Sequence, residues 1–373
     1  MEPKEPMESM ESMESMESME SMESRAPGGP RPMQPWRPAT RPSVDAAGRR
    51  IEYEWIGPGP EEAPTLVFLH DGLGCVGTWR DFPAVLAAAT GCGALIYSRT
   101  GYGGSQARPA PWPKRFMHDE ALAVLPAVLA ALGVRDGFLV GHSDGGSISL
   151  IYAASLADAP DSRQPGRPRG RRKAKQAPQP LHLVKPPRPA RSLQPAEPPH
   201  PLQPQHPLQP RGPLGPLGPR QPREPREPRQ PREPRQWLRG IVLEAPHVYV
   251  ESKSLESIAK LPGLYRHTDL WPRMVRYHGA NAENCFDSWV DAWLRPEFLS
   301  WSIVDLLPSV RCPVLDIQGD EDAFGTPAQL EAIATGCAGP TEIVVLPGCG
   351  HTPHHQQREA TLAAMTRFLH PLL

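Results

Sequence analysis

The sequence predicts an α/β protein with a mostly parallel, doubly wound sheet and a helical cap. Six short apolar runs flanked by Gly or Pro are typical of strands buried on both faces of a parallel sheet. They cover residues 65–70, 94–98, 137–143, 240–246, 313–319 and 342–348. Segments with helical periodicity separate most of these runs. Strands that alternate with helices indicate βαβ units and therefore a parallel sheet.

The remaining elements follow from periodicity. An alternating stretch at 49–57 predicts an edge strand, and helices are expected at 77–90, 118–134, 145–157, 326–336 and 358–369. Pro126 should kink or break the second of these helices, because proline cannot donate a helical hydrogen bond. A Trp-rich stretch at about 247–307 is expected to form the cap, and its aromatic side chains are expected mainly to build the cap's own core.

Two segments of biased composition are predicted to be disordered. Residues 1–48 lack periodic apolar side chains, and the first 24 form a Met-Glu-Ser repeat with eight Glu against one Lys. Residues 157–236 are rich in Pro and Arg, with 17 Arg and Lys against five acids from residue 160 on. The core is thus expected in two parts, 49–156 and 237–373. Its ordinary charge gives no reason to expect nucleic acid at the catalytic part.

Several classes of protein are excluded by what the sequence lacks. The six cysteines show no C-x-x-C pair and no regular spacing, so a zinc site or a disulfide framework is not expected. No window approaches the ~18 consecutive apolar residues of a membrane span, and the acidic start has no signal-peptide pattern. We therefore expect a cytoplasmic protein that needs no metal or other cofactor.

Ser143 is the candidate nucleophile. The stretch Gly141-His142-Ser143-Asp144-Gly145 matches the G-x-S-x-G pattern, and it lies between a predicted strand and a predicted helix. The two glycines leave room for a tight turn that would expose the serine hydroxyl at the carboxyl end of the sheet. A serine at that position still requires a general base.

The base and the acid are expected after the last two strands. His351 directly follows the final strand, whereas His354 and His355 fall near the terminal helix and are interpreted as surface histidines. The preceding strand is followed by three carboxylates, Asp320, Glu321 and Asp322, which could also be only a solvated turn. Glu244, at the end of the strand at 240–246, is a fourth candidate for the acid.

The order serine, acid, histidine is that of α/β-hydrolases, and the sequence resembles this superfamily over about 49–156 and 237–373. The resemblance includes "HDGLG", "SRTGYGGS", "GHSDGG", "GDED" and "GCGH", and it is greatest to bacterial serine hydrolases of unassigned substrate. It implies an α/β-hydrolase fold and, through the G-x-x-D pattern, Asp322 as the acid. One departure is Asp71, which stands between His70 and Gly72 where the superfamily usually reads His-Gly.

The resemblance also implies an oxyanion hole formed by backbone N–H groups. One would come from Asp144, and the other from Gly72 or Leu73. The Asp144 side chain is better explained as a helix-capping acid than as a catalytic group. His70 and His247 are candidates for the substrate pocket, although a structural hydrogen bond explains His247 equally well.

The expected reaction is hydrolysis of an ester, thioester or related acyl bond of a small molecule. Ser143 would attack the carbonyl, His351 would take the proton, and Asp322 would orient the imidazole. A second hypothesis is a non-catalytic scaffold whose basic Pro-rich arm is the functional element. In that arm proline recurs every third residue from Pro198 to Pro234, a period that suits polyproline II and weak binding of protein modules or polyanions.

Overall fold

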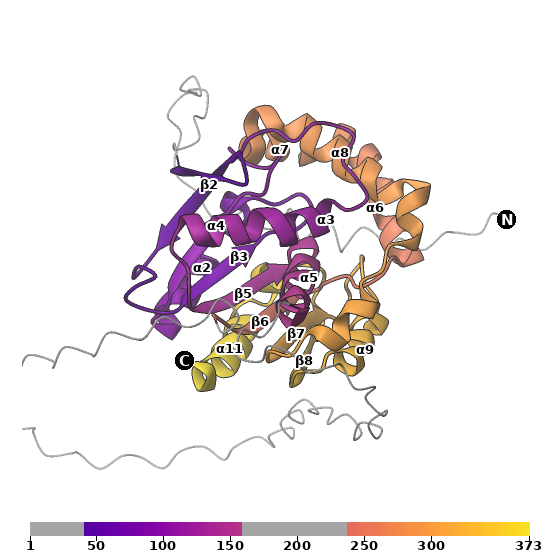
Figure 1. Ribbon diagram of the computed structural model, residues 1–373. Helices are drawn as coiled ribbons and strands as arrows, with labels where there is room; N and C mark the ends of the chain where they lie inside the picture. Colours follow the sequence, from indigo (N-terminus) through magenta and orange to yellow (C-terminus); the bar gives the residue numbers. More distant parts are fainter. Residues whose placement is uncertain (1–40, 159–236) are drawn as a thin grey trace, which may run out of the picture. The chain divides into compact units, whose positions relative to one another are not determined.

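A computed structural model describes residues 41–158 and 237–373 of the chain. The eight strands form one sheet in the order β1-β2-β4-β3-β5-β6-β7-β8 (Figure 1). Their bounds are β1 Ser43–Ala46, β2 Arg49–Ile56, β3 Thr65–Leu69, β4 Gly93–Tyr97, β5 Gly137–His142, β6 Leu238–Glu244, β7 Val314–Gly319 and β8 Thr341–Leu346. All pairs from β4 to β8 are parallel, and β2 pairs antiparallel with both β1 and β4.

The helices come between the strands, as expected for a doubly wound sheet. Their bounds are α2 Phe82–Thr90, α3 Phe116–Asp119, α4 Leu125–Ala131, α5 Asp144–Asp158, α6 Ser252–His267, α7 Leu270–His278, α8 Ala282–Leu294, α9 Pro327–Gly336, α10 Pro353–Gln356 and α11 Arg358–Leu369. A π-helical turn at Glu120–Val124 separates α3 from α4, and Pro126 lies in the first turn of α4. At this proline, where a kink or a break is expected, the chain remains helical but passes through the π turn just before it.

The sheet is covered on both faces by apolar side chains. One core joins α2 and α11 to the sheet through residues such as Phe82, Phe68 and Met365. The other joins α4 and α5 to the opposite face and continues into the helices α6, α7 and α8. In Figure 1 these three helices lie together. They belong to the stretch that was expected to form a cap.

One boundary expected from the sequence is wrong. The sheet begins at β1, so the residues from Ser43 on are folded, and β1 rather than β2 is the edge strand on that side. The other edge is β8, which is mostly half-exposed and not buried on both faces as expected, because no strand covers its outer side. Strands β1 and β2 form a tight hairpin through Ala47 and Gly48, both with positive φ (51° and 69°). A four-residue strand of sequence SVDA is too short to give a periodic signal. The Met-Glu-Ser repeat and the Pro-rich segment lie outside the described residues.

Register aligns the carboxyl ends of the central strands. His142 at the end of β5 pairs with Glu244 at the end of β6, and Gly319 at the end of β7 pairs with Leu346 at the end of β8. The chain segments that follow these strands therefore leave the sheet at one edge. In open α/β sheets this edge is where ligands bind.

Candidate active site

Ser143 occupies a strained turn between β5 and α5. Its φ is +53°, a left-handed conformation that is uncommon for residues other than glycine, and its N–H donates to the Glu244 carbonyl at 2.8 Å. The flanking glycines are required by close packing. A Cβ at Gly141 would lie 2.3 Å from the carbonyl oxygen of Gly145, and one at Gly145 would lie 1.9 Å from that of Leu69. The turn that the G-x-S-x-G pattern predicts is therefore present.

His351 and Asp322 form a hydrogen-bonded pair at the same edge. Nδ1–H of His351 donates to Oδ1 of Asp322 at 2.8 Å, which leaves Nε2 as the basic nitrogen. Asp322 also accepts from the Phe324 N–H at 2.8 Å and from the Gln318 amide at 3.1 Å. Burial would raise the pKa of Asp322, but His351 and these hydrogen bonds outweigh it and lower the pKa to about 2. The acid is therefore ionised at neutral pH.

The electrostatics of His351 favour its protonated form. Burial lowers the pKa of this imidazole, but the nearby carboxylates, above all Asp322, outweigh burial and raise the pKa above its ordinary value. His142 fixes the backbone of the same loop, because its Nε2–H donates to the His351 carbonyl at 2.7 Å. His351 is thus held through both its ring and its main chain.

The other candidate acids have different partners. Oδ1 of Asp320 accepts from the Gly348 N–H at 2.7 Å, and Glu321 is exposed. Glu244 is fully buried and its Oε2 accepts from both Nδ1 (2.8 Å) and the backbone N–H (3.0 Å) of His354. Only Asp322 among these carboxylates is hydrogen-bonded to His351 in the described residues.

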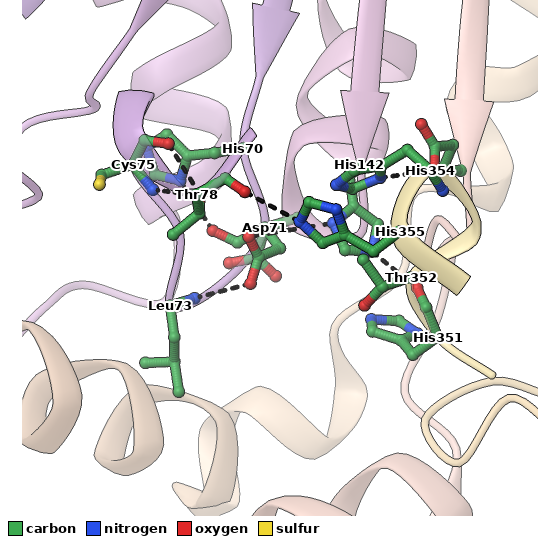
Figure 2. Close-up of polar contacts among 12 residues, drawn as sticks. His70, Asp71, Leu73, Cys75, Thr78, His142, His351, Thr352, His354 and His355 are labelled. Carbon is green, nitrogen blue, oxygen red and sulfur yellow. Dashed lines mark hydrogen bonds and ion pairs between the residues drawn. The ribbon is translucent and has the colours of Figure 1, made fainter. Parts of the chain in front are cut away.

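The interpretation of His354 as a surface residue is wrong. This side chain is 3% exposed and packs on Trp79, with ring centroids 4.5 Å apart. Burial raises the pKa of Glu244 to about 7 and lowers that of His354 to about 3, so both shifts favour a neutral hydrogen-bonded pair. His355 is partly buried, and its Nε2–H donates to the Thr78 carbonyl at 2.9 Å (Figure 2). The pair and this contact hold the chain that follows His351.

The loop after β3 holds the two candidate oxyanion-hole residues. The Leu73 N–H donates to Oδ2 of Asp71 at 3.3 Å, whereas the Gly72 N–H has no hydrogen-bond partner among the described residues. A Cβ at Gly72 would lie 2.3 Å from the indole of Trp289 in α8. Glycine at this position therefore lets the cap pack directly on the loop.

Asp144 is the first residue of α5, and its carboxylate is buried rather than capping the helix. Oδ2 accepts from Nε1 of Trp289 at 2.9 Å and lies 3.7 Å from the Arg99 guanidinium. Arg99 also donates to the Asp71 carbonyl at 2.6 Å. It thereby connects the loop after β3 with the start of α5. Sequence reasoning missed Arg99, although it lies in the Gly-rich stretch "SRTGYGGS" after β4.

The two histidines predicted for the pocket are placed differently. His70 is fully buried, and both ring nitrogens are engaged, one with the Asp71 carbonyl at 2.8 Å and the other with the Arg99 N–H at 3.0 Å. His247 lies beside the base, with its ring centroid 6.0 Å from that of His351 and 5.2 Å from that of Trp293. Its Nδ1 has no hydrogen-bond partner among the described residues.

The described ranges hold neither a candidate metal centre nor a membrane-spanning helix. No group of three or more His, Cys, Asp or Glu side chains there is arranged to hold a metal ion. None of the helices in these ranges is both long and apolar enough to cross a membrane.

Comparison with known proteins gives the family and the fold. The sequence model of the alpha/beta hydrolase family matches residues 66–364. Among curated proteins, 2-succinyl-6-hydroxy-2,4-cyclohexadiene-1-carboxylate synthase of Salmonella paratyphi C is 35% identical over 96 residues, 26% of this chain. The match spans 35% of the length of that relative.

Solved structures share the fold at low sequence identity. A thermophilic esterase from Thermogutta terrifontis has a TM-score of 0.54 and 16% identity, over 90% of this chain and 99% of that one. The enol-lactonase from Burkholderia xenovorans LB400 has a TM-score of 0.54 and 15% identity, over 88% and 99% of the two chains. Because the family model matches most of the length of this chain, the chain belongs to the alpha/beta hydrolase family.

Proposed function

We propose that the protein is a serine hydrolase that cleaves an ester, thioester or related acyl bond of a small molecule. The hydrogen bond between His351 and Asp322, at the sheet edge where Ser143 stands in its strained turn, is the observation that carries this proposal. A nucleophile, a base and an orienting acid that follow the ends of β5, β8 and β7 at one sheet edge supply what acyl transfer by serine requires. Membership of the alpha/beta hydrolase family supports a hydrolytic reaction.

The reaction would proceed in two halves. Oγ of Ser143 attacks the carbonyl carbon while Nε2 of His351 takes the hydroxyl proton, and the same imidazole then gives that proton to the leaving group. In the second half a water molecule, deprotonated by His351, attacks the acyl-enzyme and releases the acid. Asp322 keeps Nδ1 protonated and stabilises the imidazolium in both halves.

The oxyanion hole is assigned to the N–H groups of Gly72 and Asp144. Of the two loop amides, that of Leu73 is engaged by Asp71, so the Gly72 N–H is the one available for an oxyanion. Asp144 contributes its backbone N–H at the start of α5, where the helix dipole also favours negative charge. Arg99 and Trp289, which both contact the Asp144 carboxylate, would act as positioning residues for these two amides.

Covalent trapping tests this proposal directly. A fluorophosphonate should label the wild-type protein once, on the peptide that contains Ser143, and Ser143→Ala should abolish the labelling. Ser155→Ala is the matched control, because Ser155 lies on the same helix and its hydroxyl donates to the Tyr152 carbonyl at 2.7 Å. Labelling that survives in Ser143→Ala would overturn the assignment. No labelling of the wild type would instead favour the scaffold hypothesis, whose Pro-rich arm lies outside the described residues.

A further inference from the structure

Asp71 presents a carboxylate beside the proposed oxyanion hole. The side chain is 31% exposed, whereas those of Asp144 and Asp322 are at most 1% exposed. In Figure 2 it lies between Leu73 on one side and His142 and His351 on the other. Gly74 leaves space for it, because a Cβ at that position would lie 2.0 Å from Oδ1 of Asp71. The carboxylate is therefore accommodated at the site and remains reachable from solvent.

One oxygen of this carboxylate is free to bind a ligand. Oδ2 accepts from the Leu73 N–H, but no described residue donates a hydrogen bond to Oδ1. The nearest imidazole nitrogen, Nδ1 of His142, is 3.9 Å away. Because Nε2–H of His142 donates to the His351 carbonyl, the neutral ring turns an unprotonated nitrogen toward Asp71. This nitrogen cannot donate to the carboxylate.

The negative charge of Asp71 has no cationic imidazole beside it when His351 is deprotonated, as His351 must be to act as the base. Burial would raise the pKa of Asp71, but the His142 and His70 rings and the Leu73 N–H outweigh it, so the pKa lies below its ordinary value. Burial lowers the pKa of His142 to about 4 and that of His70 well below its ordinary value, so both rings are neutral at pH 7. The Arg99 cation lies 3.7 Å from the Asp144 carboxylate. With Asp71 the Arg99 guanidinium bonds the main-chain carbonyl and not the carboxylate.

An unbalanced carboxylate next to an oxyanion hole has a chemical consequence. It opposes the negative charge that develops on the substrate oxygen, and it repels acyl compounds that are themselves anionic. A substrate with its own positive charge near the scissile carbonyl would remove both penalties. Building on the serine-hydrolase function, we propose that the site selects esters that carry an ammonium group close to the scissile carbonyl, and that Asp71 is the residue that selects them.

The competing explanation is that Asp71 only closes the loop by accepting from Leu73. Asp71→Asn separates the two, because an Asn side-chain oxygen can still accept this hydrogen bond while the charge is lost. Asp45→Asn is the matched control: it makes the same change in net charge at an exposed position on the edge strand β1. For each variant, the kcat/KM or Kd of a cationic ligand is compared with that of its neutral analogue. A general loss of activity cancels in this ratio.

The first pair of ligands is acetylcholine and its neutral carbon isostere, 3,3-dimethylbutyl acetate, followed by proton release in a pH-stat. The second pair, 3-(trimethylammonio)phenylboronic acid and 3-tert-butylphenylboronic acid, places the charge on the acyl side and needs no turnover. The ammonium group also changes the intrinsic acidity of boron, so only the ratio between wild type and variant is used.

We expect Asp71→Asn to lower the preference for the cation at least tenfold in one of these pairs, in kcat/KM or in Kd. Added salt should weaken the same preference in the wild type, and Asp45→Asn should leave it unchanged. If neither preference depends on Asp71 while activity or boronate binding requires Ser143, the selection of cations is overturned and the hydrolase function stands. If neither activity nor boronate binding requires Ser143, both proposals fail.

Discussion

Asp316 is expected to make the stability of the protein depend on pH. It lies in the middle of β7, is fully buried, and neither carboxyl oxygen has a hydrogen-bond partner among the described residues. Burial raises its pKa well above the ordinary value, so the group is protonated in the folded state over a range in which the unfolded chain ionises. Its protonated form is compatible with the core, and its charged form is not.

The size of the effect follows from this difference in bound protons. The contribution of Asp316 to stability is fully present below the unfolded pKa of about 3.9 and is lost as the pH rises toward the folded pKa. Within that window the free energy of unfolding should fall by about 1.4 kcal/mol for each pH unit. Asp316→Asn removes the titration but keeps a polar group, whereas Asp316→Val also removes the unpaired oxygens, which cost about 1–3 kcal/mol.

Urea unfolding at closely spaced pH values from about 4 upward measures both effects. The free energy of unfolding of Asp316→Asn minus that of the wild type should increase by about 1.4 kcal/mol per pH unit. Asp316→Val should be more stable than Asp316→Asn at every pH. Parallel pH dependences for the wild type and Asp316→Asn would refute the reasoning, because they would mean that Asp316 has the same proton occupancy in the folded and unfolded chains.

Three further predictions concern activity. Asp322→Asn should lower kcat by about 10⁴, measured with a chromogenic short-chain ester, whereas a larger loss in Asp320→Asn or Glu244→Gln would identify a different acid. In the wild type, kcat/KM should rise with pH through a value above 6.5, because the base must be deprotonated and its pKa is raised; an acidic limb below pH 6 would contradict this. Deleting 159–236 and closing the gap with about ten Gly/Ser residues should leave kcat/KM within about tenfold, and a larger loss in a folded variant would show that the segment reaches the site.

The last of these expectations rests on the geometry at the two ends of the gap. Nε1 of Trp237, just before β6, donates to Oη of Tyr152 in α5 at 3.0 Å. The chain therefore leaves and re-enters the described fold in one region. Since β5 runs toward the edge that carries Ser143 and α5 runs back from it, this region lies at the opposite edge of the sheet.

The fold was predictable because its signals are local. The apolar strands and the helical stripes each depend on a few neighbouring residues, and these elements are present in the structure. The burial of β8 was not predictable in this way, because it depends on the place of the strand at the sheet edge. The strand β1 was missed because SVDA is short and its pairing depends on a hairpin with positive φ at both turn residues. Such a turn at Ala47 is not signalled by residue type.

Only those parts of the candidate site that follow from a motif or from chain order were predictable. Strand ends give the places of Ser143 and His351, but which carboxylate pairs with the base depends on loop geometry beyond β7. The pairing of Glu244 with His354 joins residues 110 positions apart, so no local pattern reveals it. The burial of Arg99 between two carboxyl-edge loops is likewise a product of tertiary packing.

The most direct test of the account is the rate of ester hydrolysis in Ser143→Ala and His351→Ala, compared with the wild type under identical conditions. Because nucleophile and base act as a unit, either change should lower kcat by about 10⁶ while circular dichroism and the unfolding midpoint remain close to those of the wild type. Turnover by folded Ser143→Ala within tenfold of the wild type would contradict the assignment of Ser143 as the nucleophile.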